Sequence, residues 1–568
     1  MDTPKAITMK TLRNFLFPVC FLAGCCAFFT FCYPYHLHFR EQTTLFTGFD
    51  IAQYLQKPAW ISEMFGDYLT QFFLLRGGGG LIIACVLFLL WAGFYSSFRK
   101  MKLHNAGCIA WLPVAAEWVL SCYLEYPLSM VIGAVVSVWT FRILSEIRNQ
   151  IVFRFCCIVF AIILYISVGV HFLLFILLSV IYDFKRNKSW LFPLLLLVLS
   201  FLTMYIAGHF FYLTTKQACF YPIIEGYLLS KPFVYLITEA TLLIAIFLGQ
   251  IEIKQCVLYI LTVCGLVSGI CVTSNWKEEY DLGFMCEAYY GRWDKVLEMS
   301  RQQKYKSYLS AYYANLVNAR RGQLPDSLLY RYQPAHYGLL IEVKETVPYS
   351  YVMASIDALM LCGDLEHAQH SAMLGMVFTP HQRSSRMVRR MAEISMLNRD
   401  KQAAEKFLYL LSKTTFHRRW SIRQQQLMAN GHPATIADSL CIADNDVLFS
   451  PNDIRTSITN LLKTCPGNKN AVDYLLCYHL LRKDLKSFKI DYDAYYFPFF
   501  GNNPPAVYQE ALLMCINEGV LYYHIPQSKN EEKEEYLAFF ENNKENVEAM
   551  RENFGSTYWF YHFYARLK

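Results

Sequence analysis

The sequence contains little charge for its length. Only 17% of the 568 residues are charged and 55% are hydrophobic, with a mean hydropathy of +0.24. A soluble protein of this size carries more charge on its surface, so the composition excludes an ordinary soluble chain. Residues 1–274 hold 18 Lys and Arg against 12 Asp and Glu, whereas the remainder holds 34 against 33. The basic excess lies in the apolar half, where it directs membrane topology and gives no reason to expect nucleic acid as a partner.

Signatures of catalysis and of metal binding are also missing. There is no Gly-rich phosphate loop, no HExxH, no nucleophile elbow and no zinc-deaminase pattern. The six cysteines after residue 274 are far apart and lack metal-ligand spacing, so we expect free thiols, no metal and no cofactor. These six are Cys286, Cys362, Cys441, Cys465, Cys477 and Cys515. The missing motifs leave enzymatic activity uncertain and favour a role without catalysis.

Long apolar runs fill residues 1–274 and predict a transmembrane domain. A helix needs about 20 apolar residues to cross roughly 30 Å of hydrocarbon, and we expect nine such spans. They are Phe15–Tyr33, Gly80–Phe98, Ala106–Tyr123, Pro127–Leu144, Ile151–Val168, Val170–Tyr182, Trp190–Leu213, Phe233–Leu248 and Gln255–Val272. As one straight helix, Ile151–Tyr182 would measure about 48 Å, which is too long for one crossing, whereas each of two spans would be short. The charge on the connections decides: a single span would move the basic cluster at Lys185 to the external side and break the pattern of basic loops. We therefore predict a tight hairpin at Gly169.

Basic residues on the loops predict the orientation. With nine spans, 13 Lys and Arg fall on one side of the membrane and five on the other. Because these residues favour the cytoplasmic side, we expect a cytoplasmic N-terminus and an extracytoplasmic domain at residues 275–568. Leu22-Ala-Gly-Cys25 matches a bacterial lipoprotein cleavage signal. The apolar run continues beyond it, which favours an uncleaved first helix over lipidation of Cys25.

The first external loop, residues 34–79, shows helical spacing of apolar residues at 49–55 and at 61–75. Such amphipathic helices commonly lie in the membrane interface. The loop also carries the carboxylates that an enzyme acting at the membrane surface would use. They are Glu41, Asp50, Glu63 and Asp67.

Few ionisable residues lie within the expected spans. A charge at the bilayer centre costs about 2.5–3.5 kcal/mol on insertion scales, so each of these residues is a functional candidate. They are Glu117, His171, His209 and Glu239. The simpler interpretation is that the carboxyl groups are neutral or hydrogen-bonded between helices and that the histidines lie near the interfaces.

Residues 275–568 are predicted to form amphipathic helix pairs joined by tight turns. Ala288–Glu298 and Ala358–Gln369 share a helix end, a turn glycine, an acidic residue and an apolar residue, and turn centres recur every 31 to 41 residues. This pattern resembles the tetratricopeptide repeat of about 34 residues. Gly363, Ala368 and Pro380 fit the turn, small-residue and terminating positions of that family, although its Trp and Tyr positions are unmatched. The resemblance implies a helical solenoid, which usually binds another chain.

Tyrosines and arginines of this half are the candidates for contacting a partner. We single out Tyr290, Tyr313, Arg383, Arg386 and Arg390, the arginines sharing one helical face. The simpler interpretation is that the tyrosines form inter-repeat core and that the arginines form a solvated face. The aromatic run at 557–564 is too costly to leave in water, and we expect it to close the last repeat.

Three segments resemble a bacterial family of multi-pass membrane proteins of unknown function. They are Tyr68-Leu-Thr-Gln-Phe-Phe73, Tyr508-Gln-Glu-Ala-Leu-Leu513 and Tyr558-Trp-Phe-Tyr561. The resemblance covers most of the chain, but Pro58-Ala-Trp60 stands where a Pro-Gly-Gly is expected. It implies a protein of the bacterial inner membrane and no particular activity.

The leading hypothesis is a membrane-anchored helical-repeat scaffold, in contact with the lipid bilayer, that binds a protein partner in the bacterial cell envelope. The alternative is a glycosyltransferase-like enzyme that uses a lipid-linked sugar. Such enzymes share the plan of several spans and a long first external loop with an essential carboxylate. No Asp-x-Asp pair marks that loop here. A transporter using Glu117 and Glu239 is a third possibility.

Overall fold

The computed structural model describes residues 9–566, apart from 224–231, 303, 343–346, 380–381, 431–453, 502 and 516–525. Every regular element in these residues is a helix, which confirms the expected all-α class. The chain forms two compact units. The first comprises Met1–Glu279 with Thr414–Phe416, and the second comprises Tyr280–Lys413 with His417–Lys568.

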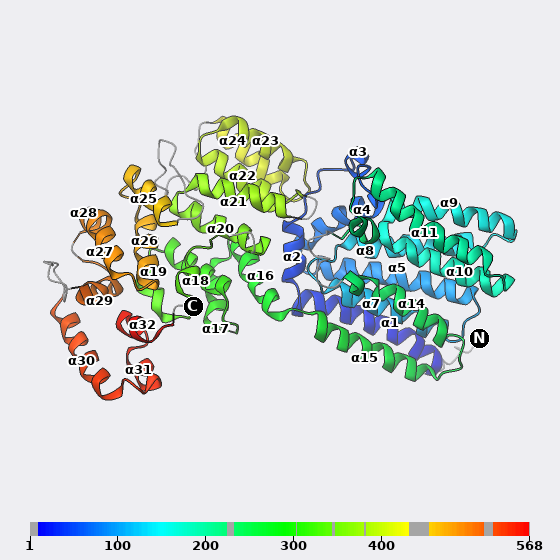
Figure 1. The fold of residues 1–568 in the computed structure, drawn as a ribbon, viewed down its shortest axis with the longest axis horizontal. Helices are drawn as coiled ribbons and strands as arrows, with labels where there is room; N and C mark the ends of the chain where they lie inside the picture. Colours follow the sequence, from blue (N-terminus) through cyan, green and yellow to red (C-terminus); the bar gives the residue numbers. More distant parts are fainter. Residues whose placement is uncertain are drawn as a thin grey trace, which may run out of the picture. The chain divides into compact units, whose positions relative to one another are not determined.

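The first unit is a bundle of helices that run alongside one another (Figure 1). Its elements are α1 (Met9–Ala27), η1 (Phe28–Cys32), α2 (Tyr35–Gln42), α3 (Ile51–Tyr54), α4 (Trp60–Thr70), η2 (Gln71–Leu74), α5 (Gly78–Lys100), α6 (Ala106–Ile109), α7 (Trp111–Ser121), α8 (Leu128–Leu144), α9 (Gln150–Val168), η3 (Gly169–His171), α10 (Phe172–Asn187), α11 (Leu191–Phe210), α12 (Thr215–Phe220), η4 (Pro232–Leu236), α14 (Ile237–Leu248) and α15 (Gln255–Thr273). Cys25 is fully buried in the core of this bundle.

Four helical runs of the described residues are long and apolar enough to cross a membrane, or up to five if the bent pair Leu16–Cys32 and Tyr35–Gln42 is one span. The four are Gly78–Lys100, Gln150–Asn187, Leu191–Phe210 and Gln255–Thr273. The prediction of nine spans is therefore wrong. Hydropathy counts apolar runs, but three of the expected spans correspond to the apolar helices Ala106–Ser121, Leu128–Leu144 and Val234–Leu248. These helices keep nearly the predicted bounds and are all shorter than the 18 residues required.

The run Gln150–Asn187 meets these length and composition criteria as one helix, but it doubles back on itself and comprises the two helices α9 and α10. Nε and Nη2 of Arg154 lie 3.0 and 2.9 Å from the two carboxylate oxygens of Asp183, 29 positions along the chain. A straight helix would hold these residues about 43 Å apart. The predicted hairpin at Gly169 is thus confirmed. Gly169 has φ +73°, a conformation that glycine adopts without strain.

The basic loops gather at one end of this bundle. Lys100 Nζ lies 2.8 Å from Glu146 Oε2, and Arg186 Nη2 donates to the carbonyl of Arg148 at 2.5 Å. The turn at Gly169 lies at the opposite end, because the hairpin separates it from Arg154. The chain leaves the first unit beside Tyr33, whose hydroxyl accepts from the Asn275 amide at 3.0 Å.

The first loop contributes α2, α3 and α4 to this unit. The glycine of α4 at position 66 packs so closely on α8 that an added Cβ would lie 2.9 Å from Ser129. Ser62, Glu63 and Thr70 are buried with it, whereas the apolar Phe65 is exposed. The small and polar face of α4 therefore packs inward, and the apolar face expected to meet the membrane interface points outward.

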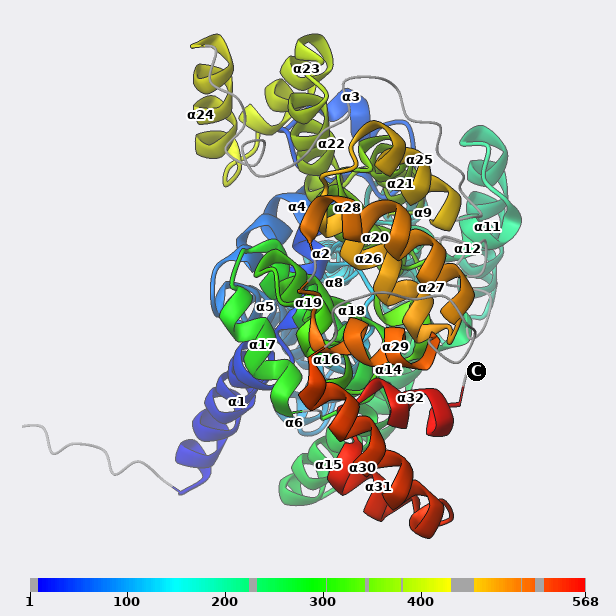
Figure 2. The same cartoon turned by 90° about the vertical axis from the view of Figure 1, so that its left-hand side faces the viewer.

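The second unit consists of consecutive helix pairs. Its elements are α16 (Trp276–Tyr289), α17 (Trp293–Gln302), α18 (Tyr308–Arg320), α19 (Leu324–Ser327), η5 (Leu328–Tyr330), η6 (Ala335–Gly338), α20 (Tyr349–Cys362), α21 (Leu365–Phe378), α22 (Ser385–Leu397), α23 (Lys401–Ser412), α24 (Arg418–Ala429), α25 (Ile454–Thr464), α26 (Lys469–Leu481), α27 (Leu485–Asp491), η9 (Tyr492–Tyr496), α28 (Phe497–Phe500), α29 (Ala506–Cys515), α30 (Gln527–Asn543), α31 (Val547–Phe554) and α32 (Tyr558–Tyr564). Figure 2 shows α22, α23 and α24 side by side.

The acidic residue after each turn has a physical role. Asp364, Asp400 and Asp484 each follow a residue of positive φ and accept a hydrogen bond from the backbone N–H three positions on. They are N-caps, which satisfy donors that a helix start leaves unpaired. The recurring sequence pattern is thus a repeated capped turn. Pro380, the expected end of one repeat, lies outside the described residues.

Two further expectations concern the second unit. Tyr558 and Trp559 are buried, and Trp559 Nε1 donates to the carbonyl of Glu510 at 3.2 Å, so the aromatic tail does close the packing on α29. Cys465 is disulfide-bonded, whereas the wide spacing of the cysteines led us to expect free thiols. Cys441 lies outside the described residues.

The turn at Gly169 provides a stability test. A Cβ at this position would lie 2.4 Å from the Tyr221 carbonyl oxygen. We expect Gly169→Ala to lower the free energy of unfolding by more than about 2 kcal/mol, through the clash and the positive φ. Thermal unfolding of the detergent-purified protein measures this. Gly265→Ala, on α15 with no neighbour within 4 Å, is the control and should change stability little. An equal effect of both substitutions would contradict the interpretation.

Candidate functional site

Three of the four ionisable residues singled out in the apolar half meet inside the first unit. Glu117 comes from α7, His171 from the turn between α9 and α10, and Glu239 from α14. His171 Nδ1 lies 2.7 Å from Glu239 Oε1, and His171 Nε2 lies 3.5 Å from Glu117 Oε1. All three are buried. The fourth, His209 on α11, is exposed and stacks near Tyr205 instead.

Two hydroxyl groups complete this Glu–His–Glu cluster. Thr238 Oγ1 donates to Glu117 Oε1 at 2.8 Å, and Tyr126 donates from its hydroxyl to Glu117 Oε2 at 2.8 Å. The Tyr126 oxygen also lies 2.8 Å from His171 Nε2. Sequence reasoning missed both residues, although Thr238 is adjacent to Glu239. Tyr126 lies in the connection after α7, and no motif in the sequence marks it as a functional residue.

The hydrogen bonds restrict where the protons can lie. A hydroxyl has one proton, so a Tyr126 hydroxyl that donates to Glu117 accepts from His171 Nε2. The short contact between His171 Nδ1 and Glu239 then contains one proton, carried by either the imidazole or the carboxyl group. Two carboxyl groups and one imidazole thus share a single extra proton in an apolar surrounding. Such an arrangement can accept or release a proton.

A glycine allows the turn to reach this position. Gly133 on α8 faces the hairpin, and a Cβ there would lie 2.9 Å from the carbonyl oxygen of Val168 and 3.8 Å from His171 Cβ. Only a residue without a side chain lets α8 approach the turn this closely. The sequence of α8 therefore helps to place His171 between the two carboxyl groups.

The four acidic residues of the first loop do not form one group. Glu41 on α2 and Glu63 on α4 are buried. Asp67 accepts from the Tyr54 hydroxyl at 2.9 Å, and Asp50 is exposed and caps α3 by accepting from the amide of Ala52. The loop nevertheless lies beside the cluster. Nε of the buried Arg40 donates to the carbonyl of Leu124 at 3.1 Å, on the segment that leads to Tyr126.

In the second unit, the residues proposed to contact a partner are mostly interior. Tyr313 and Arg386 are fully buried, and Arg390 is largely buried. Arg383 and Tyr290, like Arg390, are partly accessible. Arg386 and Arg390 lie on α22, whereas Arg383 precedes that helix, so the three arginines do not share one helical face. Arg386 and Arg390 pack against α16 and α20 and do not form a solvated surface.

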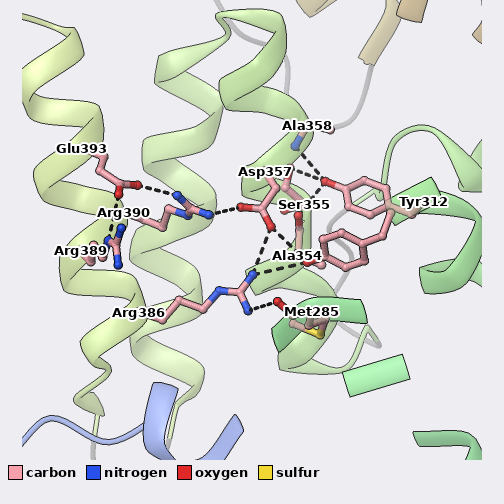
Figure 3. A network of polar contacts seen from close by, with 11 residues as sticks. Met285, Tyr312, Ala354, Ser355, Asp357, Ala358, Arg386, Arg389, Arg390 and Glu393 are labelled. Carbon is pink, nitrogen blue, oxygen red and sulfur yellow. Dashed lines mark hydrogen bonds and ion pairs between the residues drawn. The ribbon is translucent and has the colours of Figure 1, made fainter. Parts of the chain in front are cut away.

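These side chains form a polar network around Asp357 of α20 (Figure 3). Arg386 Nη2 and the Tyr313 hydroxyl each donate to Asp357 Oδ2 at 3.1 Å, while Arg390 Nη2 donates to Oδ1 at 2.7 Å. Arg390 and Arg389 also bind Glu393. Burial alone would raise the pKa of Glu393, but the two guanidinium groups outweigh it and hold that pKa below its usual value. The network is therefore a structural element of the core.

The sequence comparisons identify a family and say nothing about this architecture. The model of a family of unknown function, DUF6057, matches residues 8–565. The chain belongs to the DUF6057 family. No curated protein and no solved structure matches this member of the family. Among the described residues, no three His, Cys, Asp or Glu side chains are arranged to hold a metal ion.

The Asp357 network makes a prediction about stability. Replacing Arg386 by Gln leaves a buried carboxylate short of a cation, and breaking such a pair costs about 3–5 kcal/mol. We expect Arg386→Gln to lower the melting temperature of the purified DUF6057 protein markedly. Arg423→Gln removes the same charge from an exposed position on α24 and should have almost no effect. An unchanged melting temperature of Arg386→Gln would contradict a structural role, and Arg386 would again be a candidate for binding a partner.

Proposed function

We propose that this protein is a membrane-anchored scaffold whose second unit, a tetratricopeptide-like helical array, binds a protein partner in the bacterial cell envelope. The residues that support the proposal differ from those expected. Tyr308 and Tyr332 are 45% and 40% exposed, and the Tyr337 ring lies 5.8 Å from that of Tyr308. The Lys306 ammonium group lies 5.7 Å from the Tyr332 ring. Exposed tyrosines beside cationic side chains are typical of the energetic centres of protein interfaces.

The orientation is part of the proposal. The basic loops lie together at one end of the first unit, and basic loops favour the cytoplasm. The chain leaves that unit beside Tyr33, at the other end. The disulfide at Cys465 also favours an oxidising compartment. These observations support a protein of the bacterial inner membrane with an extracytoplasmic second unit.

The tyrosine surface is tested by crosslinking in intact cells. Because interface tyrosines often contribute more than about 2 kcal/mol, the double variant Tyr308→Ala with Tyr332→Ala should lose about 30-fold or more in affinity and its crosslinked partner. Tyr409→Ala is the matched control, since Tyr409 is 57% exposed and also carries a lysine, Lys413, over its ring. Persistence of the crosslink in the double variant, or its loss in the control, contradicts the proposal.

A second function is favoured by the Glu–His–Glu cluster. We propose as the alternative that the first unit is a glycosyltransferase-like enzyme that uses a lipid-linked sugar. The cluster would hold the proton taken from an acceptor hydroxyl, as a general base does. Arg40 supports this alternative by holding the first loop against the segment that carries Tyr126. Glu41 and Glu63 remain candidates on that loop.

Mass spectrometry of cellular lipids separates this alternative from the scaffold. If the cluster is catalytic, cells carrying Glu117→Gln or His171→Gln should accumulate the same lipid-linked sugar as cells lacking the protein. His209→Gln, an exposed histidine in the same unit, should leave the lipid profile normal. Equal protein levels in the membrane must be verified by blotting. An unchanged lipid profile in cells lacking the protein would eliminate the enzyme.

A further inference from the structure

A cavity of about 540 Å³ opens in the second unit between the start of α17 and the end of α18. Cavities of roughly 300–1,000 Å³ are the usual size for small-molecule sites. These two helix ends lie next to turns whose glycines, Gly291 and Gly322, have positive φ. The cavity is lined by Gly291, Arg292, Trp293, Asp294, Lys295, Val317, Arg320 and Arg321.

The lining has an excess of positive charge. Arg292 and Lys295 both pair with the buried carboxylate of Glu287, and Arg321 Nη2 lies 2.6 Å from Asp294 Oδ1. Together with Arg320, the three cations Arg292, Lys295 and Arg321 make four positive charges. Glu287 and Asp294 supply two negative charges, so the net charge is about +2. Asp294 itself is 97% exposed, so it does not fill the cavity. The surplus charge faces the space between the helices.

Arg320 is the one cation of the cavity lining for which the structure shows no ion pair with a described residue. Its guanidinium group lies 4.5 Å from the centre of the Trp293 ring. Among the described residues it has no hydrogen-bond or ion-pair partner, and the charges of Asp357 and Arg390 act on it from a longer distance. A guanidinium group carries five N–H donors in a rigid fork suited to oxyanions. The Trp293 ring holds the group at the cavity without using those donors.

The backbone adds to the attraction for an anion. Trp293 and Asp294 are the first two residues of α17, a helix of ten residues, and the Lys295 N–H donates to the Arg292 carbonyl at 3.1 Å. The first N–H groups of a helix lack partners within the helix, and the helix dipole places partial positive charge there. The basic side chains and the helix start therefore favour the same kind of ligand.

We propose that this cavity binds a phosphate-bearing anion. A phosphate monoester carries about −1.5 to −2 charge at pH 7, which matches the surplus of the lining, whereas a carboxylate supplies only −1. The cavity is larger than a phosphate group, so it also accommodates part of the molecule that carries the phosphate, beside the indole of Trp293. The phosphate belongs to a soluble ester or to a lipid headgroup, and both offer the same chemistry.

The test uses full-length protein in nanodiscs of phosphatidylcholine, titrated with inorganic pyrophosphate in a calorimeter. We expect saturable binding that weakens at high salt. Arg320→Gln and Arg321→Gln should each weaken it about tenfold or more, because each removes a charge-assisted hydrogen bond. Asp294→Asn should strengthen it, because it removes the opposing charge. Arg423→Gln, on the exposed face of α24, is the control and should leave the affinity unchanged.

Nanodiscs that also contain phosphatidic acid distinguish the two sources of phosphate. Competition between this lipid and pyrophosphate assigns the cavity to a lipid headgroup, and unchanged pyrophosphate affinity assigns it to a soluble ester. The proposal is overturned if pyrophosphate does not bind saturably, or if Arg423→Gln weakens binding as much as Arg320→Gln. Weaker binding by Asp294→Asn would also overturn it, since the sign of the charge effect would be wrong.

Discussion

The ion pair between Arg154 and Asp183 closes the hairpin of α9 and α10, and the candidate site of the first unit depends on that closure. Asp183 is fully buried, and its carboxylate binds both nitrogens of a guanidinium fork. Arg154 is 30% exposed, and Asn187 Nδ2 also donates to Asp183 Oδ1 at 2.7 Å, so the buried carboxylate is satisfied by a guanidinium group and an amide. The pair fixes the register of the two helices. Because His171 lies in the turn that joins them, the same register places its imidazole between Glu117 and Glu239.

Buried charge is balanced differently in the two units. In the second unit, Asp357 and Glu393 face three arginines, and every carboxylate oxygen of Asp357 accepts a hydrogen bond. That network stays charged without gaining or losing a proton. In the first unit, two carboxyl groups share one imidazole. Burial of these three groups therefore requires a proton shared between the imidazole and a carboxyl group. Carboxylates paired with arginines are sufficient for a stable fold. Proton transfer requires groups that share a proton, as in the Glu–His–Glu cluster. This contrast is the physical reason to look for function in the Glu–His–Glu cluster.

Sequence reasoning succeeded where a single physical rule decides the outcome. The cost of a charge in an apolar span drew attention to Glu117, His171 and Glu239, which the structure brings together, and the basic residues on the connections placed the hairpin at Gly169. Sequence reasoning failed where the packing partner of a side chain decides the outcome. Amphipathic spacing cannot distinguish a helix face that meets solvent from one that meets another helix, so Arg386 was interpreted as part of a solvated face although it is buried. The bounds of the apolar helices were close to those predicted, but several of these helices are too short for a span, and the number of spans was overestimated.

The position of a residue within a helix pair explains which side chains of the second unit can bind. A residue in the middle of a helix is flanked by neighbouring helices of the array, and Tyr312 and Tyr313 in the middle of α18 are fully buried. Residues at helix ends and in the connections have fewer neighbours. Tyr308 begins α18, Arg320 ends it, and both are exposed. The capped turn, recurring through this unit, therefore serves two purposes, since it holds each helix pair together and presents the residues beside it to a ligand or partner.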